Sequence, residues 1–216
     1  GLIVHTGDWK IDLTPGIGRP IDIDRLKAVG EEGVRALICD STNAVRSGRS
    51  PSEADVAERL TEIIKAAPNR VAVTTFASNV ARIHGVAVAA RAAGRDVVVM
   101  GRAMKRVIDV ATELGYLSDV PPFLDEDAYG YLPRDKVVAL LTGSQGESRA
   151  ALARIAHDEH PRVALSPGDL VIFSSRTIPG NEPPVISVVN ALAERGIQIL
   201  TDRDDLVHVS GHPRRD

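Results

Sequence analysis

Two histidines near the end of the chain, His208 and His212, lie on either side of a Ser210-Gly211 pair. An imidazole can ligate a metal ion, transfer a proton or bind a phosphate oxygen, and a Ser-Gly turn presents a hydroxyl and a backbone N–H at close range. The apolar residues that alternate with His208 favour a strand that carries these groups to one place. The alternative is that His208 is a hydrogen-bonded core residue and His212 lies in a surface turn.

Two carboxylates, Asp8 and Asp40, follow apolar runs in the first part of the chain. Residues 1–4 and 34–39 are both predicted to be buried strands, so each aspartate emerges where a strand ends. A carboxylate in such a place is a common metal ligand, whereas an isolated Gly-Asp pair such as Gly7-Asp8 often only caps a turn. If the two strands are neighbours, the two carboxylates lie side by side.

The elements that must position these groups follow a repeating order of strand, short polar loop and helix. This order is typical of right-handed crossovers and predicts an open, mostly parallel, Rossmann-like α/β sheet with helices on both faces. The predicted strands are residues 71–75, 96–100, 137–141, 170–173 and 197–200. The predicted helices are residues 24–29, 52–67, 80–94 and 104–114, a segment around 152–155 and a segment that ends at 195, with a loop at 117–133.

In such a sheet, ligands bind beyond the carboxyl ends of the strands, where the helices begin. Three loops in these places are rich in hydroxyls, amides and backbone N–H groups, at residues 76–79, 142–147 and 174–181. They predict a phosphate-binding surface, although each loop could also do no more than cap the helix that follows. None matches the glycine-rich dinucleotide fingerprint or the nucleotide P-loop, so cofactors of those kinds are not predicted.

The composition predicts a cytoplasmic globular protein of one large or two small domains. No run approaches the roughly 18 apolar residues of a membrane span, so no membrane partner is expected. The single cysteine, Cys39, lies in an apolar run and is predicted to be a buried residue of a protein from a reducing compartment. The net charge of -3 excludes a uniformly basic nucleic-acid coat, although a cluster such as Arg102, Lys105 and Arg106 could still follow a phosphate backbone.

Five strings of residues, in this order, closely resemble bacterial ribonuclease J, a family of the metallo-β-lactamase superfamily with an inserted β-CASP domain. The strings are HTGDWKID at 5–12, DSTNA at 40–44, TGSQGE at 142–147, SSRTIPGNE at 174–182 and HVSGH at 208–212. The resemblance covers nearly the whole chain. It implies that residues 1–45 are part of the metallo-β-lactamase core, that 46–205 form the β-CASP domain, and that 206–216 return into the core.

The resemblance also implies roles for individual residues. Asp8 matches an aspartate that bridges two zinc ions, and Asp40 matches an acidic motif that steadies nearby histidines. His212 matches a histidine that contacts the scissile phosphate and assists proton transfer. The implied pocket for the phosphate of a neighbouring nucleotide contains Ala77, Ser78, Ser175, Arg176, His208, Ser210 and Gly211.

The chain departs from the family pattern in its metal ligands. The family's His-x-His-x-Asp-His motif and its next histidine ligand would precede Gly1, and its last metal-binding histidine would follow Asp216. Trp9 and Ser148 also stand where the family pattern favours Phe and Pro. We therefore expect a fragment that keeps one metal ligand and is inactive alone.

The function implied for the parent protein is that of a zinc-dependent endonuclease and 5′ exonuclease acting on RNA, as a homo-oligomer of two or four copies. Two alternatives of different classes remain open. The first is a non-catalytic phosphate- or RNA-binding α/β module, for which the same loops would suffice. The second is a small-molecule metallohydrolase, because a two-zinc core is shared across the superfamily.

Overall fold

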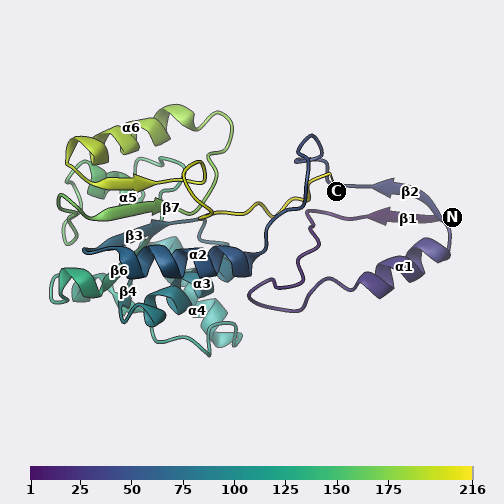
Figure 1. The fold of residues 1–216 in the computed structure, drawn as a ribbon, viewed down its shortest axis with the longest axis horizontal. Helices are drawn as coiled ribbons and strands as arrows, with labels where there is room; N and C mark the ends of the chain where they lie inside the picture. Colours follow the sequence, from purple (N-terminus) through teal and green to yellow (C-terminus); the bar gives the residue numbers. More distant parts are fainter. Residues whose placement is uncertain (216) are drawn as a thin grey trace.

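The computed structural model describes residues 1–215, and the chain begins with a small unit that stands apart from the main body (Figure 1). In this unit, strands β1 (Leu2–His5) and β2 (Val34–Ile38) pair in parallel, and helix α1 (Ile23–Glu31) lies between them in sequence. Both predicted strands are confirmed. Their parallel pairing puts the two carboxyl ends at the same edge.

The burial predicted for these two strands is wrong. Leu37 and Ile38 in β2 are 61% and 54% exposed, and Cys39 beyond them is exposed as well. Every residue of α1 is also at least partly exposed, and two strands with one short helix cannot enclose their apolar side chains. Cys39 is therefore an exposed thiol in this chain and not a core residue.

The main body is a sheet of six parallel strands in the order β5-β4-β6-β3-β7-β8. The strands are β3 (Val71–Thr74), β4 (Asp96–Met100), β5 (Leu124–Asp125), β6 (Val137–Leu141), β7 (Leu170–Phe173) and β8 (Gln198–Leu200). Because neighbouring strands run in the same direction, the chain crosses a face of the sheet between them. The predicted open, parallel α/β sheet is confirmed.

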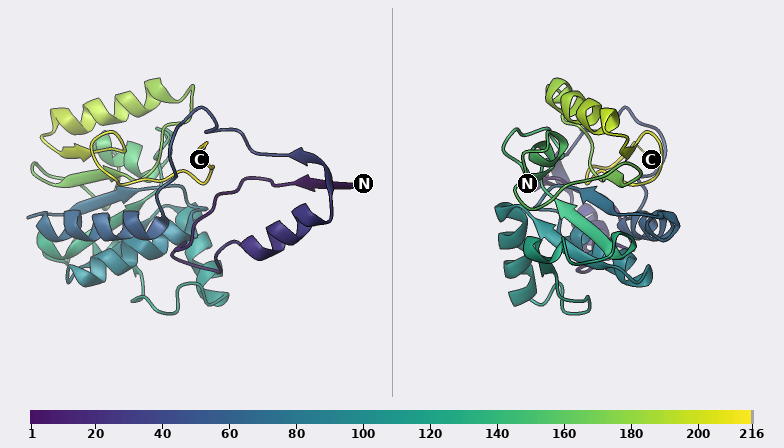
Figure 2. Two further views of the ribbon diagram at one scale, coloured as in Figure 1. Left: turned by 45° about the vertical axis from the view of Figure 1, so that its right-hand side comes forward. Right: turned by 90° about the vertical axis from the view of Figure 1, so that its left-hand side faces the viewer.

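Helices cover both faces of the sheet (Figures 1 and 2). They are α2 (Glu53–Ala66), α3 (Val80–Ala92), α4 (Arg102–Glu113), α5 (Ala151–Ala156) and α6 (Glu182–Glu194). The first three pack in one core cluster and the last two in another. Val71 and Val73 of β3 belong to the first cluster and Ala72 to the second, as the period of two in a strand requires.

The stretch at 117–133, predicted to be a loop, is mostly irregular but contains short elements. These are β5 and the 3-10 turn η1 (Glu126–Ala128), and a second turn, η2 (Arg134–Lys136), precedes β6. Among residues 1–215, no helix is both long and apolar enough to cross a membrane.

The segment after β8 returns to the strand pair in an irregular form (Figure 1). The prediction of a strand around His208 is wrong. The backbone at Val207 forms hydrogen bonds with side chains and does not pair with a neighbouring strand. The carbonyl of Val207 accepts hydrogen bonds from Ser174 Oγ at 2.6 Å and from Arg82 at 3.0 Å. Val207 and Val209 are nevertheless buried, in the same core cluster as α2 and α3.

Two segments therefore connect the strand pair with the main sheet, one after β2 and one after β8 (Figures 1 and 2). They lie side by side where they meet the strand pair. Asn43 and Arg214 form an isolated parallel bridge, and the backbone N–H of Arg215 donates to the carbonyl of Arg46 at 2.9 Å.

Candidate metal and phosphate site

Three side chains that the sequence singles out meet at the end of the strand pair. Ligand atoms of Asp8, Asp40 and His212 all lie within 4.8 Å of one another. The parallel pairing of β1 and β2 brings the two aspartates to one edge, and the segment after β8 carries His212 to them. Gly7, with a φ of +59°, turns the chain between β1 and Asp8.

Asp40 and His212 form a hydrogen-bonded pair, with 2.7 Å between Asp40 Oδ2 and His212 Nδ1. The other oxygen, Oδ1, accepts the backbone N–H of Thr42 at 2.9 Å. The bonds from Thr42 and then from His212 lower the pKa of Asp40 to about 2. Asp40 is therefore ionised at neutral pH, so Nδ1 of His212 donates to it and Nε2 lies on the opposite side of the ring.

The donor set suits a divalent cation such as Zn²⁺, which takes carboxylate oxygens and imidazole nitrogens. The three members differ in how free they are. Both oxygens of Asp40 already accept hydrogen bonds, whereas Asp8 is exposed. Asp8 is thus the carboxylate best suited to ligate a metal, and Asp40 the one best suited to orient His212.

The backbone around His212 is held by residues of the segment after β2. The amide of Asn43 donates to Ser210 Oγ at 3.0 Å and to the carbonyl of His212 at 3.3 Å. Ser50 Oγ donates to the same carbonyl at 3.2 Å, and the N–H of His212 donates to Ser210 Oγ at 3.2 Å. Asn43 is buried, and the sequence analysis assigned it no role although it lies three residues after Asp40.

A cavity of about 280 Å³ opens between the two connecting segments and the end of β7. It brings together three residues of the predicted phosphate pocket, Arg176, His208 and Ser210. Three further arginines line it, Arg46, Arg203 and Arg214, together with Asp202, Asp204 and Asp205. Nε of Arg176 donates to Asp202 Oδ2 at 3.3 Å, so an aspartate holds the guanidinium at the cavity.

Two predicted phosphate-binding residues carry buried polar atoms that have no hydrogen-bond partner in the described part of the chain. They are Ser175 Oγ and His208 Nδ1. Burial, and then the positive charge of Arg82, lower the pKa of His208 to about 4, so its ring is neutral at neutral pH. His208 is therefore not a fully hydrogen-bonded core histidine, and each unpaired atom is available to a polar ligand.

Four of the seven predicted residues, Ser175, Ala77, Ser78 and Gly211, stand outside the lining of this cavity. Ala77 and Ser78 follow β3, whose register with β7 puts their loop beside Ser175 at the same edge of the sheet. Ala77 packs on the core, and the residue after Ser78, Asn79, caps α3 by accepting the N–H of Arg82 at 3.0 Å. Gly211 is an exposed residue in the bend before His212.

Gln145 organises the loop after β7, a role that the sequence analysis did not assign. Its Nε2 donates to the carbonyl of Arg176 at 3.0 Å, and its Oε1 accepts the N–H of Ile178 at 2.8 Å and the Asn181 amide at 3.3 Å. The side chain therefore fixes both ends of the loop that presents Arg176. The only sequence signal was its place in TGSQGE, one of the strings that carry the family resemblance.

The fold and the site together define an α/β protein in which a six-stranded parallel sheet and a separate strand pair meet at a candidate metal and phosphate site. Comparison with known families agrees with this class. Residues 68–192, more than half of the chain, match the family described as "Ribonuclease J, beta-CASP domain".

Curated relatives extend the match over the whole chain. The chain is 61% identical over 215 residues to ribonuclease J of Sinorhizobium meliloti, covering 100% of this chain and 38% of that protein. It is 45% identical to ribonuclease J of Mycolicibacterium smegmatis, over 98% of this chain and 38% of that protein. For ribonuclease J of Helicobacter pylori strain J99 the identity is 41%, over 98% of this chain and 31% of that protein.

The chain belongs to the ribonuclease J family and contains its β-CASP domain. It spans between about a third and two fifths of the length of these relatives.

Proposed function

We propose that the protein to which this chain belongs is a zinc-dependent ribonuclease that hydrolyses phosphodiester bonds in RNA, both within the strand and from the 5′ end. The observation that carries the proposal is the meeting of Asp8, Asp40 and His212 within 4.8 Å, beside a cavity lined by arginines. Membership of the ribonuclease J family supports RNA as the substrate.

Asp8 would hold the metal with its exposed carboxylate. Two zinc ions need more ligands than residues 1–215 offer at the site, and further residues of the complete protein would contribute them. When bound, zinc supplies a hydroxide at neutral pH and neutralises charge on the phosphate.

His212 would act on the phosphate through Nε2, because Nδ1 is held by Asp40 at 2.7 Å. Asp40 holds the ring so that Nε2 faces away from the carboxylate, and His212 would donate a proton from Nε2 to the oxygen that leaves. Ser210 and Asn43 contribute by fixing the backbone on which His212 stands.

The cavity would hold the phosphate of a nucleotide beside the cut, with Arg176, Ser210 and the neutral ring of His208 as partners. A phosphate oxygen would also give the buried hydroxyl of Ser175 the acceptor that it lacks. Ala77, Ser78 and Gly211 would contribute backbone N–H groups from the neighbouring loops.

Two variants of the complete protein test this proposal. Asp8→Asn is expected to lose bound zinc together with RNA cleavage, because the amide is a weaker ligand than the carboxylate. His212→Ala is expected to keep its fold and zinc but to cleave RNA about 100- to 10,000-fold more slowly in single-turnover experiments, the usual loss for a general acid. Zinc content is measured on the same samples.

The matched control is His84→Ala. His84 in α3 is also paired with an aspartate, at 3.0 Å from Asp119, but it is not part of the site. A wild-type rate for His212→Ala at full zinc occupancy contradicts its catalytic role. RNA binding without cleavage by the wild-type protein would favour a non-catalytic binding module, and turnover of small esters or lactams instead of RNA would favour a small-molecule hydrolase.

The same proposal includes the division of the chain and its assembly. Residues 1–45 and 206–216 would belong to a metallo-β-lactamase core and residues 46–205 to the β-CASP domain, within which the matched residues 68–192 fall. The complete protein would form a dimer or tetramer, which light scattering coupled to size-exclusion chromatography tests.

A further inference from the structure

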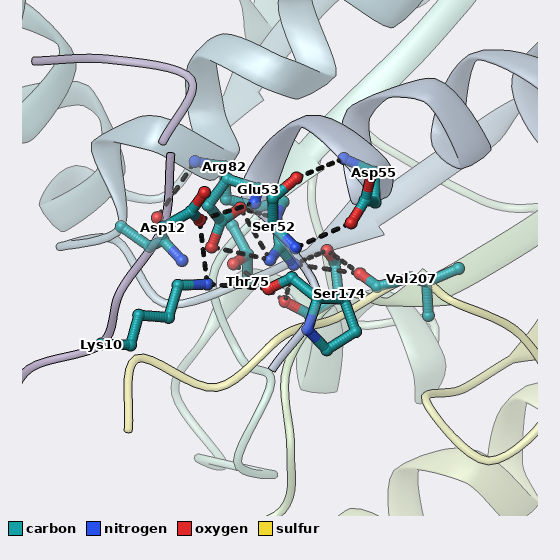
Figure 3. A network of polar contacts seen from close by, with 11 residues as sticks. Lys10, Asp12, Ser52, Glu53, Asp55, Thr75, Arg82, Ser174 and Val207 are labelled. Atoms are coloured by element: carbon teal, nitrogen blue, oxygen red, sulfur yellow. Dashed lines mark hydrogen bonds and ion pairs between the residues drawn. The ribbon is translucent and has the colours of Figure 1, made fainter. Parts of the chain in front are cut away.

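Arg82 is a buried arginine at the point where α2, β7 and the segment after β8 meet (Figure 3). Its side chain is 1% exposed. Nη1 donates to the carbonyl of Ser174 at 3.2 Å, to Ser174 Oγ at 2.6 Å and to the carbonyl of Val207 at 3.0 Å. Nε and Nη2 form a two-point contact with the carboxylate of Glu53, at 3.0 and 3.1 Å.

The line of polar contacts continues from Glu53 to the segment that follows Asp8 (Figure 3). The backbone N–H of Glu53 donates to Asp12 Oδ2 at 3.1 Å, and the same oxygen lies 3.1 Å from Lys10 Nζ. Lys10 also donates to the carbonyl of Pro51 at 3.1 Å. Both ionic side chains are largely buried, with 12% and 7% of their surface exposed.

This network joins the two chain segments that carry the candidate site. One end of it is Asp12, four residues after Asp8, and the other end is Val207, five residues before His212. The same two segments meet a second time at the site, where ligand atoms of Asp8 and His212 lie within 4.8 Å of each other.

We propose that Arg82 is a positioning residue, which sets how the segment carrying His212 lies against the strand end carrying Asp8. The expected effect on RNA cleavage rests on the proposed function. The effect of Arg82 on the conformation around Asp8 does not, and it is tested by a separate measurement.

Only a forked cation makes these contacts together. The guanidinium reaches Glu53 with two nitrogens on one side and Ser174 and Val207 with the third on the other. A lysine keeps the charge and has three N–H donors, but they are all on one nitrogen, so it cannot reproduce the two-point contact with Glu53 and also reach Ser174 and Val207 from the positions of the guanidinium nitrogens. Arg82→Lys therefore separates the positioning role from the need for a buried positive charge.

Trp9 provides a readout that does not depend on activity. It is the single tryptophan of the sequence, and it lies between Asp8 and Lys10 with a buried indole N–H. Together with Asp40 and Pro213 it lines a cavity where the strand pair and the returning segment meet. Its fluorescence therefore reports on the junction that Arg82 is proposed to set.

The experiment measures Trp9 emission in this chain without metal and the kinetics in the complete, zinc-loaded protein. We expect Arg82→Lys to shift the emission maximum and to lower kcat for RNA about 10- to 100-fold with KM little changed, since small misplacements at a reacting centre have such effects. Ser174→Ala, which removes one hydroxyl of the network and leaves the ion pair intact, is expected to change both quantities in the same direction by less.

The matched control is Arg95→Lys. Arg95 is also buried, but it donates to the carbonyls of Ala67 and Asn69 at the opposite end of the sheet. It is expected to lower the melting temperature without moving Trp9 emission or the kcat of folded protein.

The inference is overturned if Arg82→Lys and Ser174→Ala, both folded by circular dichroism, keep wild-type Trp9 emission and kcat. It is also overturned if Arg95→Lys shifts Trp9 as much as Arg82→Lys, since loss of stability would then explain the shift. A wild-type protein that does not cleave RNA would end the proposed function instead, and the emission data would still decide the role of Arg82.

Discussion

His208 is a titratable residue whose surroundings keep it uncharged. Burial is the main cause and the charge of Arg82 the next, and together they lower its pKa to about 4 from an ordinary value of 6.5. Between those two pH values the unfolded chain binds more protons than the folded one. The stability associated with the neutral ring is therefore complete above about pH 6.5 and is lost as the pH falls toward 4.

We expect the chain to lose about 1–2 kcal/mol of unfolding free energy through His208 between pH 7.5 and pH 5. Urea unfolding at both pH values, for the wild type and for His208→Gln, isolates this contribution, because glutamine does not titrate. The exposed His157, replaced by glutamine, serves as the control and should leave the pH dependence unchanged. An equal pH dependence in wild type and His208→Gln would contradict the buried, neutral state.

At the scale of elements, the loop after β6 lies against the first turn of α6 with no room for a side chain at Gly146. Gly146 has a φ of +74°, and a Cβ built on it would lie 2.5 Å from the carbonyl carbon of Pro184 and 2.6 Å from the nitrogen of Val185. The first turn of α6 thus packs directly on the backbone of the loop that also contains Gln145. Only glycine permits both the left-handed backbone and this contact.

Gly146→Ala is therefore expected to destabilise the chain by about 2–4 kcal/mol, the sum of an overpacking cost and a left-handed backbone cost. The control is Gly115→Ala, which has a similar φ of +79° but no atom within 4 Å of the added Cβ, and should cost about 1 kcal/mol. Chemical denaturation of both variants gives the difference. Equal losses would show that α6 does not press on this loop.

The sheet could be predicted from the sequence because strands buried on both faces leave continuous apolar runs, as in β6, where all five residues are buried. Apolar alternation was a weaker guide at 207–209, where the predicted strand did not form. Alternating valines there report burial correctly, but they do not reveal that the carbonyl of Val207 bonds to Ser174 and Arg82. Apolar character also misled for β2, whose residues are exposed because no element among residues 1–215 covers them.

The site depended on information that spacing does not hold. His212 and Asp40 are 172 residues apart and came together in the prediction only through the family resemblance. Arg82 was not selected, because an arginine in a helix is read as a solvated charge until its burial is seen. Asn43 and Gln145 act through backbone carbonyls and N–H groups, and a sequence does not say which backbone groups lack partners.

At the scale of the whole molecule, the two aspartates of the site follow a strand pair that has few buried residues to stabilise it. Leu37 and Ile38 are exposed, and the described residues at the site offer three candidate ligands for a metal, of which Asp40 is already engaged. High zinc affinity in proteins comes from three or four deprotonated ligands in a preformed arrangement.

Residues 1–216 alone are therefore expected to bind Zn²⁺ weakly. Isothermal titration calorimetry at neutral pH measures this directly, with Asp8→Asn as the comparison that identifies any site-specific heat. A tight, stoichiometric site in the wild-type chain would contradict the expectation, and it would mean that Asp8, Asp40 and His212 form a complete centre.

Because Asn43 and Arg214 are bridged, the segment that leaves the strand pair and the segment that returns to it lie next to each other. Residues 44–213 therefore form an insertion whose two ends lie together. Its length and sequence can vary without separating the strand pair from the segment that returns to it. In such an arrangement the inserted residues can change without moving Asp8 and Asp40, which follow the two paired strands.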